Sequence, residues 1–122
     1  WHVRGWCEKN QGYRDFVLSR FRGEPEVMDV SDHTAVRDAE WQKQIDVIIT
    51  PDPRLSSAQQ DVVAQDYDMT EGQLVLHVRA KLLPYVIKFL QIDLNVREQN
   101  PRAQQLVIAN QQELQHWLFG AD

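Results

Sequence analysis

Segments with the hydrophobic period of strands and of helices alternate along the last two thirds of the chain, and this alternation restricts the fold. Ile45, Val47 and Ile49 share one face of a strand expected over residues 44–50, which Pro51 ends. Strands that alternate with helices predict a small α/β sandwich, in which helices cover a sheet. The further segments are strands over residues 73–79 and 104–109, and helices over 56–67, over 82–90 and from Asn110 to Gly120.

Two of the expected helices start with the residues of a capping box. Ser56 or Ser57 is followed three residues later by a glutamine, and Asn110 is followed by Glu113. In this arrangement the two side chains satisfy backbone N–H groups at the start of the helix. The remaining helix contains Pro84, which a helix tolerates only in its first turn.

The first 23 residues contain two more alternating segments, joined by a polar loop over residues 8–12 that ends on a glycine. They predict two adjacent strands, over residues 1–7 and 12–21. Paired in this way, the strands would present arginine, histidine and aromatic side chains together. Such groups hold an anion against a π-face and do not make or break bonds. The side chains concerned are His2, Arg4 and Trp6 in the first strand, and Arg14, Phe16, Leu18 and Arg20 in the second.

The polar stretch between these two regions is expected to join two modules. Gly23 and Pro25 mark a turn, and residues 26–30 predict a third short strand. Residues 31–40 predict a linker with a short helical turn. The boundary is therefore placed at residue 40, with one module over residues 1–40 and the other over residues 41–122.

Charge is distributed unevenly between these modules. The formal net charge of the chain is −5, but residues 1–23 contain five basic and two acidic residues. A net negative charge argues against wholesale binding of nucleic acid. A basic segment attached to an acidic body indicates a local anion site instead.

The residues that catalysis and metal binding require do not occur in a recognisable spacing. Cys7 is the only cysteine, which excludes an intrachain disulfide and a multi-cysteine zinc site. His33, His77 and His116 fit no metal-ligand spacing, and no phosphate-binding loop or nucleophile motif occurs. We therefore expect no enzyme activity, no cofactor and no metal.

Neither a membrane segment nor a targeting segment stands out in the sequence. No apolar run approaches the roughly 20 residues that span a bilayer. No basic segment followed by an apolar core marks a signal peptide. A single thiol fits a reducing compartment, so we expect a cytoplasmic protein without membrane contact. The chain starts on an expected strand and lacks an initial methionine, and it is expected to be a piece of something larger.

The first segments resemble the WYL-domain family of bacterial transcriptional regulators. Trp1-His2-Val3 occupies the position of the family's Trp-Tyr-Leu motif, and residues 14–20 that of its second signature, Arg-x-Phe-x-Leu-Asp-Arg. Trp-His-Val-Arg at the first motif is typical of the defence-island members associated with phage-resistance systems. Two departures matter: His2 replaces the tyrosine, and Ser19 replaces the acidic residue of the second signature.

This resemblance implies an α+β chain with two parts. Residues 1–40 would be the C-terminal part of an Sm-like (SH3-like) antiparallel β-barrel and its linker. Residues 41–122 would be a ferredoxin-like α/β extension that helps dimerisation. The resemblance further implies a homodimeric regulator, in which a winged helix-turn-helix domain N-terminal to this chain binds operator DNA. Leu82, Val86, Phe89, Trp117 and Leu118 are assigned to the core or to dimer contacts.

The resemblance also implies a nucleotide-like or oligonucleotide effector, bound in a basic patch on the first module. Without it, the arginines would be ordinary strand residues paired with Asp15 or Glu8. A second function that fits the sequence is direct binding of single-stranded nucleic acid. The candidate ligand-binding residues are His2, Arg4, Trp6, Arg14, Phe16 and Arg20.

Overall fold

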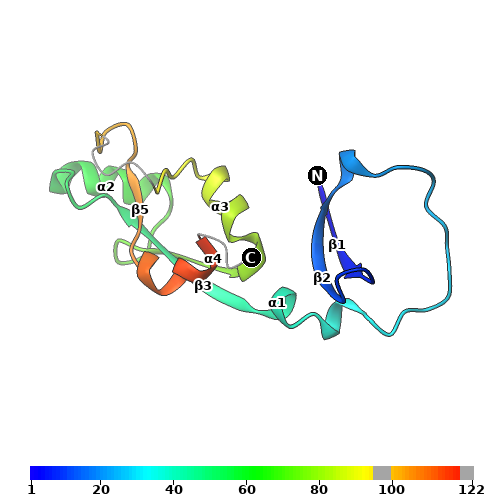
Figure 1. Cartoon of the computed structure of the whole chain (residues 1–122). Helices are drawn as coiled ribbons and strands as arrows, with labels where there is room; N and C mark the ends of the chain where they lie inside the picture. The colour runs from blue at the N-terminus through cyan, green and yellow to red at the C-terminus, as the bar shows by residue number, and fades with distance from the viewer. Residues whose placement is uncertain (95–99, 119–122) are drawn as a thin grey trace. The chain divides into compact units, whose positions relative to one another are not determined.

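The computed structural model describes residues 1–94 and 100–118. The chain divides into two compact units, unit 1 (Trp1–Gln42) and unit 2 (Lys43–Asp122). Both can be followed in Figure 1, where the colour runs from blue at the N-terminus to red at the C-terminus. Unit 1 is built on a two-stranded sheet and unit 2 on a three-stranded sheet. Both sheets are antiparallel, and the described residues form no closed barrel.

Unit 1 is a β-hairpin followed by a long loop and two short helical segments. Strands β1 (His2–Cys7) and β2 (Gly12–Val17) pair antiparallel, as the alternating pattern predicts. The second strand is shorter than expected, because a 3₁₀ turn, η1 (Leu18–Arg20), replaces its end. The backbone N–H of Leu18 donates to the carbonyl of Trp1 at 3.0 Å, which closes the hairpin where that turn begins.

The third short strand expected over residues 26–30 is wrong. Those residues form an exposed loop, in which Val27 is 103% and Val30 98% exposed. No partner strand lies beside them among the described residues, and an isolated extended segment leaves its backbone groups to water. The helical turn expected in the linker is confirmed by η2 (Ala35–Arg37), which α1 (Ala39–Gln42) follows.

Unit 1 contains no apolar core, and the structure describes every residue of it. Asp38, at 3% exposure, is its only buried residue. A two-stranded hairpin is only marginally stable in water by itself. Polar contacts to Asp38 therefore have an unusually large share in holding this unit together.

Unit 2 is organised around a central strand, β3 (Gln44–Pro51). Strands β4 (Leu74–Arg79) and β5 (Leu106–Ile108) pair antiparallel with it on either side, giving the order β4-β3-β5. All three strands coincide with segments that the sequence predicts as strands, and β3 and β4 show the alternating pattern. The mixed α/β character is thus confirmed, while the described sheet gives no support to the finer ferredoxin-like description.

One face of this sheet carries the core of unit 2. Val47 and Ile49 on β3 are 1% and 0% exposed, because the pleat turns both of them to that face. Leu74, Leu76 and Val78 of β4 pack against the same cluster. The buried residues of the cluster are Val47, Ile49, Leu55, Val63, Leu83, Ile87, Ile92, Leu106, Ile108 and Leu114.

Helices α2 (Ser57–Asp66) and α3 (Leu83–Phe89) start as the sequence predicts. Ser56 caps α2: its hydroxyl accepts from the N–H of Gln59 at 3.2 Å, and its own N–H donates to the Gln59 side chain at 3.0 Å. Pro84 lies in the first turn of α3, which the 3₁₀ turn η3 (Ala80–Leu82) precedes.

The expected capping role of Asn110 is wrong. Its side chain reaches β3 instead, where it accepts from the N–H of Ile48 at 3.0 Å and donates to the carbonyl of Asp46 at 2.8 Å. It thus replaces a backbone partner just beyond the end of β5. The chain continues as η4 (Gln111–Leu114) and α4 (Gln115–Leu118), and Gly120 lies outside the described residues.

An ion pair between a buried carboxylate and an exposed arginine fixes the turn that follows β3. The carboxylate of Asp52, a residue 3% exposed, accepts from the Arg54 backbone N–H at 2.9 Å and from Arg54 Nη2 at 2.7 Å. These hydrogen bonds lower the pKa of Asp52, because they stabilise its charged form more than burial penalises it.

We therefore predict that Asp52→Asn lowers the stability of unit 2 by about 1–3 kcal/mol at neutral pH. A carboxyl with a lowered folded-state pKa stabilises the fold above its unfolded-state pKa, and this contribution disappears as pH falls through the folded-state value. The difference between wild type and variant should therefore shrink below about pH 4. Urea unfolding at a series of pH values measures it, and a difference that stays constant with pH would contradict the assignment.

Candidate functional site

The register of the hairpin divides five of the six candidate residues between its two faces, while Arg20 lies beyond the paired strands in η1. Arg4 lies opposite Asp15 and Trp6 opposite Tyr13, so that these pairs share a face with His2. Arg14 lies opposite Gly5 and Phe16 opposite Val3, on the other face. The expectation that both strands present these side chains together is therefore wrong. An alternating pattern fixes the faces of each strand but not which faces coincide after pairing.

Arg4 forms ion pairs with three acidic side chains of unit 1. Its Nε and Nη2 form a two-pronged contact with the Asp38 carboxylate at 2.5 and 3.0 Å. Nη1 reaches Asp15 at 3.3 Å and Nη2 reaches Glu40 at 3.5 Å. The hydrogen bond with Asp38 is the main reason that the pKa of Arg4 is raised, so the guanidinium stays charged. We call Arg4, Asp15, Asp38 and Glu40 the Arg4 cluster.

Asp38 also organises the backbone around this cluster. Its carboxylate accepts from the N–H of Trp41 at 3.2 Å, and its carbonyl accepts from the N–H of Gln42 at 3.0 Å. It therefore caps α1 while it binds Arg4 on the hairpin. Sequence reasoning missed Asp38 and Glu40, because they lie 34 and 36 residues from Arg4 and no local pattern connects them.

Trp6 is enclosed by other rings rather than open on both sides. The His33 ring lies parallel to it, with centroids 3.6 Å apart and an interplanar angle of 1°. Tyr13 meets Trp6 edge-on at 5.2 Å, and its hydroxyl donates to the carbonyl of Thr34 at 2.8 Å. These contacts hold the returning loop on the hairpin. His33 already occupies one face of the indole, which leaves at most the other face for a base.

Arg14 and Arg20 differ from Arg4 in their surroundings. Both are exposed, and within the described part of the chain neither guanidinium forms an ion pair or hydrogen bond. Arg14 lies on β2 and Arg20 in η1, five residues after Asp15. Phe16, which lies between these two arginines in the sequence, is half-buried. Two uncommitted guanidinium groups on one hairpin are suited to binding an anion.

The thiol of Cys7 lies at the end of β1 and is half-buried, not part of a core. Asn10 Nδ2 donates to its sulfur at 3.3 Å. Hydrogen bonding by Asn10 lowers the thiol pKa, and Arg14 adds a smaller electrostatic contribution in the same direction. This places a positive field from Arg14 at the loop end of the hairpin.

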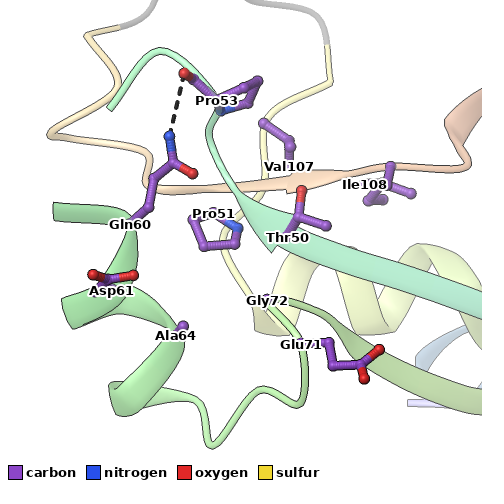
Figure 2. A pocket seen from close by; sticks show the side chains of 11 residues that line it. Thr50, Pro51, Pro53, Gln60, Asp61, Ala64, Glu71, Gly72, Val107 and Ile108 are labelled. Atoms are coloured by element: carbon purple, nitrogen blue, oxygen red, sulfur yellow. Dashed lines mark hydrogen bonds between the residues drawn. The ribbon is translucent and has the colours of Figure 1, made fainter. Parts of the chain in front are cut away.

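Unit 2 contains an open groove of about 670 Å³ between α2, β5 and the turn at Gly72 (Figure 2). Among the residues that the structure describes, its polar lining includes Thr50, Gln60, Asp61 and Glu71 and no lysine or arginine. Two carboxylates without a cation disfavour a phosphate-bearing ligand. None of the six candidate residues lies in it, so the groove does not serve the predicted nucleotide-like ligand.

Two further properties concern the described residues as a set. Within residues 1–94 and 100–118, no three His, Cys, Asp or Glu side chains come together in a way that could hold a metal ion. The same residues include no helix with the length and apolar character needed to cross a membrane.

Comparison with known proteins identifies what the chain is similar to. Residues 44–114 match the family described as "BrxR transcriptional regulator, C-terminal dimerization domain". The chain is also 30% identical over 118 residues to the DNA-binding transcriptional repressor CapW of Stenotrophomonas maltophilia, which covers 97% of the chain and 40% of that relative. CapW repressors of Escherichia coli strain KTE188 and Pseudomonas aeruginosa are 34% and 32% identical over 114 residues, 93% of the chain and 38% of each relative.

The chain thus spans about two fifths of the length of these curated relatives. The family and the relatives are transcriptional regulators and not enzymes, as the sequence predicts. The match over residues 44–114 includes all three strands of unit 2 and more than half of the chain. The chain therefore belongs to the BrxR family of transcriptional regulators, whose C-terminal dimerization domain forms its unit 2.

Proposed function

We propose that this chain is the effector-sensing and dimerisation region of a cytoplasmic bacterial WYL-type repressor, linked to phage defence. The observation that carries the regulatory part is the match of residues 44–114 to a dimerization domain, together with relatives named DNA-binding transcriptional repressors. Unit 2 would join two copies. A winged helix-turn-helix domain elsewhere in the protein would bind operator DNA.

Unit 1 would bind the effector, a nucleotide-like or oligonucleotide anion. The exposed guanidinium groups of Arg14 and Arg20 support this, because each can form a two-pronged contact with a phosphate. Arg4 contributes less directly, since its donors already face Asp38, Asp15 and Glu40. The other candidates are His2, Trp6 and Phe16. Among these, Trp6 offers a stacking surface on the ring face that His33 does not cover, but the register places it on the opposite side of the hairpin from Arg14.

Effector binding changes repression only if the ligand has different affinities for two states of the dimer. The long loop of unit 1 returns onto the hairpin through Tyr13 and the Trp6–His33 stack. A ligand on the hairpin could therefore favour one arrangement of this loop. Such a bias, passed on to unit 2, would alter how the two DNA-binding domains fit an operator.

We predict that Arg14→Ala and Arg20→Ala each weaken binding of a short fluorescent oligothymidylate by about tenfold or more, since charge-assisted hydrogen bonds are lost. The fold should remain intact, because neither side chain has a structural partner among the described residues. Fluorescence anisotropy measures the affinity, and a reporter gene measures derepression. Arg37→Ala is the matched control: it removes an exposed arginine of the same unit that lies in η2 and not in the hairpin or in η1.

Normal derepression in the Arg14→Ala or the Arg20→Ala variant would overturn the basic-patch assignment.

A salt titration distinguishes the effector-sensing function from the second candidate function, direct binding of single-stranded nucleic acid. Steep salt dependence without sequence preference supports that alternative, because phosphate contacts release counterions. Saturable binding of one small nucleotide supports the sensor.

For the Arg4 cluster we predict that removing Arg4 lowers the stability of unit 1. Arg4→Ala leaves the Asp38 carboxylate buried without its main partner, which costs about 3–5 kcal/mol. Hydrogen exchange of the hairpin amides should therefore accelerate strongly in Arg4→Ala and less in Asp15→Ala, since Asp15 is exposed at the edge of the cluster. A variant with native exchange rates but no oligothymidylate binding would instead make Arg4 a ligand residue.

A further inference from the structure

Helix α3 has apolar side chains on two faces, and only one of them belongs to the core. Leu83, Ile87 and Leu90 follow helical spacing and pack into unit 2. Tyr85 and Phe89 on the other face of α3, and Leu82 at the end of η3 just before it, follow the same spacing and are 48%, 86% and 38% exposed. We call these three residues the α3 stripe. The sequence pattern assigns Leu82 and Phe89 to the core or to dimer contacts, and their exposure excludes the core.

No other surface formed by the described residues of the matched domain has a comparable group. Its remaining large exposed apolar side chains, among the residues described, are Val62, Tyr67 and Val75. Val62 lies on α2, Tyr67 at the end of that helix and Val75 on β4, so they form no stripe along one helix face. An aromatic side chain as exposed as Phe89 is a typical anchor of a protein interface.

We infer that the α3 stripe is the surface through which two copies of this chain dimerise. The inference rests on the proposed function, which assigns dimerisation to unit 2, and it names the residues responsible. A twofold axis brings the same patch of both copies together, so a single stripe can supply both sides of the contact. Two antiparallel α3 helices would place Phe89 of each copy near Leu82 of the other. Tyr85, midway between them, would lie close to the axis.

The test is sedimentation equilibrium of the complete regulator over a wide concentration range. Phe89→Asp puts a charge into the proposed contact, so the dimer dissociation constant should rise about 30-fold or more, as for an interface hot spot. Tyr85→Asp is expected to act in the same direction. Val62→Asp is the matched control, because it places the same charge on another exposed helix position. Its dissociation constant should stay within about twofold of wild type.

The possible outcomes separate this inference from the proposed function. A wild-type dimer that Phe89→Asp leaves unchanged would refute the α3 stripe and leave dimerisation by unit 2 standing. A wild-type monomer at all concentrations would refute the proposed dimerisation itself. Equal weakening by Phe89→Asp and Val62→Asp would also refute the stripe. Circular dichroism and thermal unfolding verify that each variant is folded, which the exposure of Phe89 and Val62 leads us to expect.

Discussion

The structure of unit 2 depends on the pairing of strand β3 with both of its neighbours. One face of β3 supplies the centre of the core through Val47 and Ile49, and its edges hold β4 and β5. Where β5 ends, the Asn110 side chain continues the contact with β3. Helix α3 packs against this core with one face only. The other face of α3 is therefore left exposed, and we propose that a second copy of the chain covers it.

Unit 1 is stabilised by a different kind of interaction. Its single buried residue is a carboxylate, Asp38, which the Arg4 guanidinium neutralises while the backbone of α1 hydrogen-bonds to it. A buried charge held in this way is costly to leave unpaired, and so it fixes one arrangement of hairpin and helix. Arg4 is committed to this role, whereas Arg14 and Arg20 are exposed and form no ion pair within the described residues, which is why we propose them as the cations that bind a ligand.

Local signals were sufficient for most of unit 2. Strands β3 and β4 follow from alternation, β5 from a short apolar run, and the Ser56 cap from residues three apart, and the structure confirms them. Contacts between distant residues were not predictable in this way. Asn110 has the local sequence of a helix cap, but partners more than 60 residues away bind its side chain. Likewise, no sequence pattern around Arg4 predicts its contact with Asp38. Alternation also does not determine which face of β1 and which face of β2 lie on the same side of the hairpin.

Sensing and dimerisation are thus assigned to separate units, and the account requires that they be coupled. The measurement that tests this most directly is operator binding by the complete regulator, with and without a saturating short single-stranded oligonucleotide. Anisotropy titration of labelled operator DNA should show an affinity change of about fivefold or more, the usual lower range of allosteric coupling. An operator affinity that does not change, although the oligonucleotide occupies the hairpin, would contradict the account.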